Sequence, residues 1–132
     1  MRANLQNNLA DMIKEVKQRN AKKVMIQLPE GLKTRITEIT DALGSSGIEC
    51  IVSADPSYGA CDLADAEAKQ SGCDLLVHIG HSKFYVDFNT HVPVLYYPWT
   101  FDIKLGGIDF SAIKEKAVGI ITNIQHMKLL GE

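Results

Sequence analysis

The chain has 132 residues, of which 45% are hydrophobic and 23% charged, and its formal net charge is −2. This length and composition are typical of one soluble globular domain with a buried core. The small net charge gives no reason to expect a nucleic-acid or membrane surface, and no apolar run approaches the ~20 residues that span a bilayer. The polar, amphipathic N-terminal segment does not resemble a signal peptide, so a cytoplasmic location is expected.

The hydrophobic pattern predicts helices alternating with strands along the chain. Apolar residues recur at helical spacing near the N-terminus and around Ile39, whereas short apolar runs bounded by Gly, Pro or polar residues indicate strands. In chain order we expect a helix over 5–16, a strand over 24–28, a helix over 36–43, a strand over 48–53, a helix over 62–70, strands over 74–79 and 94–97, a short helix near 111–116 and a last apolar run over 118–122.

This alternation is typical of parallel sheets whose crossovers are helical. We therefore predict an α/β fold, a three-layer Rossmann-like domain with a mainly parallel sheet of about four strands flanked by helices. Ligands of such folds bind beyond the carboxyl ends of the strands. The chain contains neither GxGxxG nor GxxxxGK[ST], so no dinucleotide or triphosphate cradle is indicated.

Loops that follow the predicted strands carry the candidate binding residues. Gln27 ends the first strand and is a good donor and acceptor for a polar ligand, although it equally suits satisfying loop backbone. Glu30 suits an ammonium group or ribose hydroxyls, or alternatively a solvated first helical turn. Gly31 permits close approach of a ligand to the backbone.

The third predicted strand leads into two further candidates. His81 lies just past this strand, after a glycine, where the cleft is expected. Ser82 follows it and suits either the site or a capping position. His78 alternates with apolar neighbours and is predicted to be a hydrogen-bonded core histidine instead.

The three cysteines, Cys50, Cys61 and Cys73, match neither a disulfide framework nor a CxxC zinc pair. Cys50 and Cys73 fall in or beside predicted strands and are interpreted as structural. Cys61 lies in a loop at the predicted start of a helix, where the helix dipole favours the thiolate that binds soft metals and iron–sulfur clusters. The alternatives are a buried cysteine of no chemical role and a nucleophilic pair with His81.

Three segments together carry a family resemblance. Gln27-Leu-Pro-Glu-Gly-Leu32, Tyr58-Gly-Ala-Cys-Asp62 and His78-Ile-Gly-His-Ser82 resemble, in order, spacing and loop placement, the archaeal diphthamide synthases, also called 2-(3-amino-3-carboxypropyl)histidine synthases. The segment 119–126 is similar to the family's entry into a second domain. The resemblance therefore implies a first α/β domain over 1–117, with 118–132 beginning a link or the first strand of a second domain.

The resemblance implies a definite chemistry. Members of this family hold a 4Fe–4S cluster through three cysteines, one from each of three similar domains, and the remaining iron binds S-adenosylmethionine. Reductive cleavage releases a 3-amino-3-carboxypropyl radical that adds to a histidine of translation elongation factor 2. By match to the motif, Cys61 is the first domain's cluster ligand. The surrounding shell is implied to comprise Gln27, Glu30, Gly31, His81 and Ser82.

The family pattern also implies partners and a limit. Archaeal members act as homodimers on elongation factor 2, with no direct nucleic-acid or membrane partner. Two further domains and two further cluster cysteines are needed for a full member, so we expect a fragment or subunit that is inactive alone. A non-catalytic dimerisation or docking module, and a small-molecule-binding or hydrolytic domain using Cys61 and His81, are the alternatives.

Overall fold

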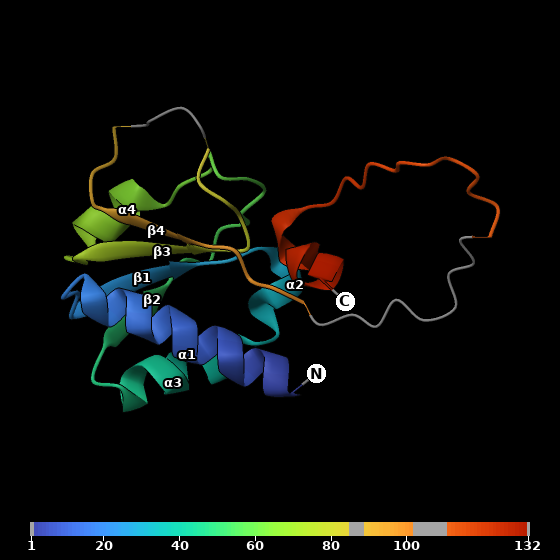
Figure 1. Cartoon of the computed structure of the whole chain (residues 1–132). Coiled ribbons are helices and arrows are strands. Elements are labelled where there is room, and N and C mark those ends of the chain that lie inside the picture. Colours follow the sequence, from blue (N-terminus) through green and yellow to red (C-terminus); the bar gives the residue numbers. More distant parts are fainter. Residues whose placement is uncertain (1, 85–88, 102–110, 132) are drawn as a thin grey trace.

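The computed structural model describes residues 2–84, 89–101 and 111–131 (Figure 1). Its elements are α1 (Arg2–Gln18), β1 (Lys23–Gln27), α2 (Glu30–Lys33), α3 (Ile36–Ser45), β2 (Glu49–Val52), α4 (Asp65–Gln70), β3 (Leu75–Ile79), β4 (Val94–Tyr97) and the 3₁₀ helix η1 (Ile124–Gly131). Within these residues, no helix is both long and apolar enough to cross a membrane.

The four strands form one sheet in the order β2-β1-β3-β4, and every neighbouring pair is parallel. The predicted α/β class with a parallel sheet of about four strands is therefore confirmed. The chain first moves outward from β1 to β2 and then crosses back to β3 on the other side of β1. This reversal places a topological switch point between β1 and β3, where open α/β sheets leave a crevice at the carboxyl edge.

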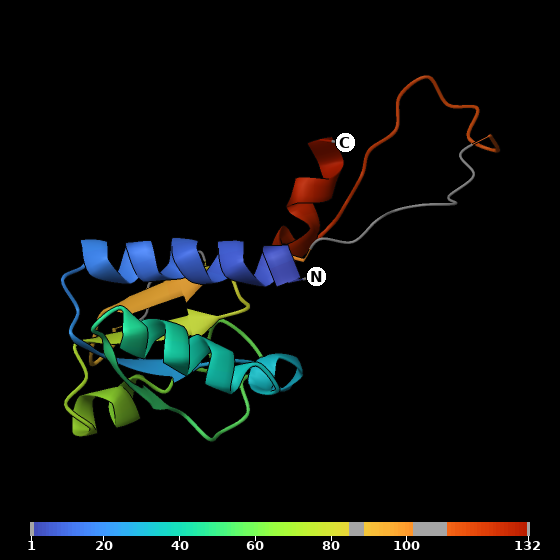
Figure 2. The same ribbon diagram turned by 90° about the horizontal axis from the view of Figure 1, so that it is seen from below.

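Helices cover both faces of the sheet, which makes three layers. In Figure 1, α4 lies above the sheet and α1 and α3 lie below it; in Figure 2, which is seen from below, α1 and α3 are on the viewer's side. The face toward α1 and α3 buries the larger apolar core, which includes Met12, Val16, Ile39 and Leu43 of these two helices. The α4 face buries a smaller cluster around Ala68.

Alternation along the strands decides which face each side chain joins. In β1, Val24 and Ile26 enter the larger core, whereas Met25 joins the α4 cluster. Successive side chains of a strand point to opposite faces, so Gln27 shares the face of Met25. By the same rule His78 shares the face of Leu76, the α4 face.

Three predicted elements differ from the structure. The helix expected over 62–70 begins only at Asp65, because residues 62–64 are held by contacts with the sheet edge described below. Residues 111–116 form no helix, and the apolar run 118–122 forms no strand; both stretches are largely exposed. Short apolar runs predict regular structure only where they pack against something. The domain boundary at 117/118 stays a prediction.

Candidate functional site

A row of three polar side chains crosses the carboxyl edge of the sheet. Gln27 of β1 is in register with His78 of β3, and His78 is in register with Tyr96 of β4. Gln27 and His78 are 2% and 0% exposed. The ring centroids of His78 and Tyr96 lie 5.6 Å apart, edge to face. The row therefore lies on the α4 face at the switch point between β1 and β3.

This row holds the loop that joins β2 to α4. Gln27 Nε2 donates to the carbonyl oxygen of Asp62 at 2.9 Å, and the Ala64 backbone N–H donates to Gln27 Oε1 at 3.1 Å. Tyr96 Oη donates to the carbonyl oxygen of Ala60 at 3.3 Å. Burial raises the pKa of Tyr96, which keeps the phenol protonated as a donor. The loop is thus bonded to the sheet on both sides of residue 61.

Cys61 is presented by this loop as an exposed thiol. It lies in a turn that the Asp62 N–H closes on the Gly59 carbonyl at 3.0 Å, and Asp62 Oδ2 accepts from the Tyr58 N–H at 3.1 Å. The prediction of a helix N-terminus at Cys61 is wrong, since α4 begins four residues later. Clamping by the polar row, rather than a helix dipole, determines where this sulfur lies.

Space beside the sulfur comes from Gly59. A β-carbon at this position would lie 3.9 Å from Cys61 Sγ, so any larger side chain would start beside the sulfur. Tyr58 is 81% exposed and is not packed against the loop. In the same loop the Ser57 hydroxyl is buried, and among the described residues it has no hydrogen-bond partner.

The other two cysteines lie away from this edge. Cys50 is half-buried within β2, and its Sγ lies 4.0 Å from the Thr40 carbonyl oxygen of α3. Cys73 is buried just before β3 begins, at the amino edge of the parallel sheet. Burial raises the pKa of both thiols, which disfavours thiolate. Their predicted structural placement agrees with the structure.

His78 and His81 form a bonded pair beside the row. His78 Nδ1 lies 2.9 Å from Gln27 Oε1, and His78 Nε2 lies 2.9 Å from His81 Nδ1. Burial first, and then the neighbouring His81 ring, lower the pKa of His78 from 6.5 to about 4. The prediction of a hydrogen-bonded core histidine is confirmed. His81 itself is partly exposed and lies at the predicted edge.

The remaining predicted site residues surround this edge. Glu30 is exposed in the first turn of α2 and forms an ion pair with Lys33, one of the two environments expected for it. Ser82 is exposed after the end of β3. Gln27 contacts loop backbone and His78, which is the second of its two expected roles. Direct ligand contacts by Gln27, Glu30, Gly31 and Ser82 stay predictions.

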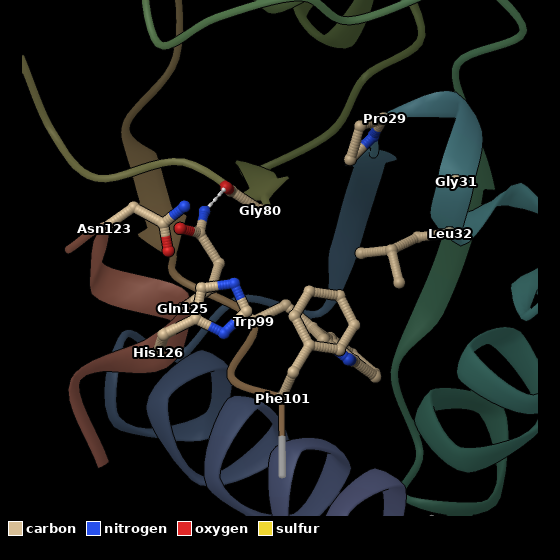
Figure 3. Close-up of a pocket in the computed structure, with 9 residues that line it drawn as sticks. All are labelled: Pro29, Gly31, Leu32, Gly80, Trp99, Phe101, Asn123, Gln125 and His126. Atoms are coloured by element: carbon tan, nitrogen blue, oxygen red, sulfur yellow. Dashed lines mark hydrogen bonds between the residues drawn. The ribbon is translucent and has the colours of Figure 1, made fainter. Parts of the chain in front are cut away.

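A pocket of about 280 Å³ opens at this same carboxyl edge (Figure 3). Trp99 and Phe101 line it opposite Pro29, Gly31 and Leu32, which come from the loop after β1 and from α2. Gln125 of η1 donates to the Gly80 carbonyl across the pocket. Trp99 is buried, whereas Phe101 is 40% exposed.

Gly80 is expected to tolerate no side chain. Its φ of +92° is one that L-residues rarely adopt, and a β-carbon there would lie 3.0 Å and 3.1 Å from ring atoms of Pro29. We expect Gly80→Ala to lower the free energy of unfolding by roughly 1–3 kcal/mol, measured by urea denaturation. Gly31→Ala is the matched control, since a β-carbon there meets nothing within 4 Å. Equal stability of the two variants would contradict this account.

The residues present fit one ligand of a metal cluster rather than a complete site. Among the described residues no group of three or more His, Cys, Asp or Glu side chains could hold a metal ion. Cys61 nevertheless has the properties of a single soft ligand: an exposed thiol, a loop bonded to the sheet on both sides, and an open position beside Sγ. No hydrogen bond joins Cys61 to His81 in the described part of the chain, so the nucleophilic pair gains no support.

Sequence reasoning did not identify Tyr96 as part of the site. Gln27, His78 and Tyr96 are polar residues that end or nearly end their strands, but only the strand register aligns them in one row. His91 is exposed and its Nδ1 lies 2.8 Å from Asp65 Oδ2. Both contacts join residues that lie more than 20 positions apart in the sequence.

Comparison with known proteins places this edge in a family context. Residues 28–132 match the family model described as "Putative diphthamide synthesis protein". The chain is 43% identical over 89 residues to 2-(3-amino-3-carboxypropyl)histidine synthase of Pyrococcus horikoshii, covering 67% of this chain and 25% of that protein. It is 32% identical over 129 residues to subunit 1 of the same-named synthase of Gibberella zeae, covering 93% of this chain and 28% of that protein.

Two solved structures are similar to this chain in both fold and sequence. The crystal structure of Dph2 from Pyrococcus horikoshii with a 4Fe–4S cluster is similar with a TM-score of 0.61 and 42% identity, covering 67% of this chain and 26% of that one. A second crystal structure of Dph2 from Pyrococcus horikoshii gives the same TM-score at 41% identity. This chain thus spans about a quarter of the length of these relatives. On the family-model match and these identities together, the chain belongs to the diphthamide synthesis protein family.

Proposed function

We propose that this chain is the first α/β domain of a 2-(3-amino-3-carboxypropyl)histidine synthase and that Cys61 supplies one thiolate ligand to a 4Fe–4S cluster. The observation that carries the proposal is the exposed Cys61 thiol, held at the switch point by the bonds of Gln27 and Tyr96 to its loop. The similarity to the Dph2 structure with a 4Fe–4S cluster supports it. The first domain is proposed to comprise residues 1–117, with 118–132 leading into a second.

The proposed activity is transfer of the 3-amino-3-carboxypropyl group of S-adenosylmethionine to a histidine of elongation factor 2, in a homodimeric protein. When bound, the cluster would supply the electron for reductive cleavage of the sulfonium, so that the transfer is a radical reaction. The chain's own residues position the sulfur and line the edge. Glu30, Gly31 and Ser82 are proposed to contact the polar substrate; of these, Gly31 lines the pocket at the carboxyl edge. Gln27 keeps the Cys61 loop on the sheet.

On its own, the 132-residue chain is proposed to hold no complete cluster and to have no activity. Cys50 is half-buried in β2 and Cys73 is buried at the opposite edge of the sheet, so neither can share a cluster with Cys61 without rearrangement of the fold. A cluster bound by protein thiolates needs several such ligands. The remaining ligands must therefore come from outside the described residues.

Anaerobic reconstitution with iron and sulfide tests both statements. With excess 2-mercaptoethanol to supply the other thiolates, we expect protein-bound iron on the native chain and on Cys50→Ala, and its loss in Cys61→Ala. Without the small thiol, no stoichiometric cluster should form. Iron retention in Cys61→Ala would contradict the ligand assignment, and a stable stoichiometric 4Fe–4S spectrum on the chain alone would contradict its proposed inactivity.

A further inference from the structure

Hydrogen bonds connect the Cys61 loop to Gln27, Gln27 to His78, and His78 to His81. Two backbone groups of the loop determine which atom is the donor in each of these bonds. The Asp62 carbonyl can only accept and the Ala64 N–H can only donate. Gln27 contacts both, so its Nε2 must face Asp62 and its Oε1 must face Ala64. The orientation of this buried side-chain amide is therefore not a free choice.

The orientation of the Gln27 amide fixes the donor and acceptor nitrogens of His78, and these in turn fix those of His81. Because Gln27 Oε1 is an acceptor, His78 Nδ1 at 2.9 Å must carry a proton. Burial lowers the pKa of His78 to about 4, so at neutral pH its Nε2 is an unprotonated acceptor. His81 Nδ1, 2.9 Å from that nitrogen, must then carry a proton itself.

The consequence concerns the other ring nitrogen of His81. Burial lowers the pKa of His81, opposed by the nearby Asp62 carboxylate, so the ring is neutral at pH 7. A neutral ring protonated at Nδ1 has a lone pair at Nε2. Within the described residues that nitrogen has no hydrogen-bond partner, and His81 is partly exposed at the carboxyl edge. An acceptor is thus left open to a ligand.

We propose that His81 Nε2 accepts a hydrogen bond from an N–H donor of the substrate, and that Gln27 and His78 are positioning residues that hold His81 in this acceptor tautomer. The identity of the donor rests on the proposed function, which offers two sources: the imidazole of the target histidine and the ammonium group of S-adenosylmethionine. The tautomer itself rests only on the contacts within this chain.

Nitrogen-15 NMR of the histidine rings tests the tautomer without any ligand or cluster. In the native chain at neutral pH we expect His81 Nε2 to show the pyridine-like shift of an unprotonated nitrogen and Nδ1 the pyrrole-like shift. His78→Asn keeps a donor toward Gln27 but removes the acceptor toward His81, so the His81 shifts should move toward tautomer averaging. A protonated His81 Nε2 in the native chain, or unchanged His81 shifts in His78→Asn, would overturn the proposal.

Two probes then distinguish the sources of the donor. We expect addition of 4-methylimidazole or of S-adenosylmethionine to shift the His81 Nε2 resonance, and the probe that does so identifies the donor. His91 is the internal control, since its Nδ1 is likewise bonded, to Asp65 at 2.8 Å, but it lies outside the row. If neither probe shifts His81 more than His91, the acceptor role is wrong. Repeating the titration with Cys61→Ser separates this result from the cluster assignment, which iron binding tests.

Discussion

Replacing Gln27 by leucine is expected to lower the free energy of unfolding by about 3 kcal/mol. Leucine is similar in size to glutamine but cannot form hydrogen bonds, so the substitution removes the partners of the Asp62 carbonyl, the Ala64 N–H and His78 Nδ1. Each buried polar group left without a partner costs about 1–3 kcal/mol, and part of this cost is relieved if the loop moves to reach water. Chemical denaturation with constant m-value is the measurement.

The matched control is Gln70→Leu, at the exposed C-terminal end of α4. An exposed site of this kind is expected to change stability by less than about 0.5 kcal/mol. Thiol labelling adds a local readout, because release of the loop should change the labelling rate of Cys61 more than that of Cys50. A Gln27→Leu protein as stable as Gln70→Leu would show that the polar row does not hold the loop.

Acidification from about pH 6.5 to about pH 4 is expected to destabilise the fold through His78. Burial lowers the pKa of this ring from 6.5 to about 4 in the folded protein, whereas the unfolded chain keeps the ordinary value. Between these values the unfolded state binds more protons, so stability rises with pH across the window and is lost as pH falls. At about 1.4 kcal/mol per pH unit, the total is on the order of 3 kcal/mol.

Denaturation curves at several pH values across this window measure the effect, with His78→Asn as the comparison. This variant lacks the titrating ring and should have a flatter dependence on pH. Asp65 also has a lowered pKa, owing to its hydrogen bonds with His91, but a carboxyl lowered from 3.8 loses its contribution below this window. Equal slopes in the native chain and His78→Asn would mean that His78 is not the responsible group.

The strands and their shared carboxyl edge could be predicted from the sequence, because buried strands have a recognisable pattern of apolar residues. β1 and β3 each contain three consecutive apolar residues, 24–26 and 75–77, as is typical of strands covered on both faces, and their burial in the structure is nearly complete. Parallel strands share one carboxyl edge, so the loops after β1, β2 and β3 had to meet. Cys61 and His81 were therefore placed on one edge before any contact between their loops was known.

The start of α4 and the role of Tyr96 were not accessible in this way. The acidic residues after Cys61 are compatible with a first helical turn, but the sheet edge offers the Asp62–Ala64 backbone alternative partners in Gln27. Tyr96 reads as one more aromatic strand residue until register places it beside His78. Helix and strand propensities depend on residues near one another in the sequence, so they do not predict a hydrogen bond between residues 35 or more positions apart.

By itself the sequence determined the α/β class, the parallel sheet and the exposed edge at which Cys61 lies, because apolar periodicity and the rules of parallel crossovers act locally along the chain. Only the tertiary structure decided what holds Cys61 there and which nitrogen of His81 remains open. Both depend on the register that aligns Gln27, His78 and Tyr96 across three strands. A hydrogen bond needs its two atoms within about 3 Å, and only the assembled sheet sets such distances between residues far apart in the sequence.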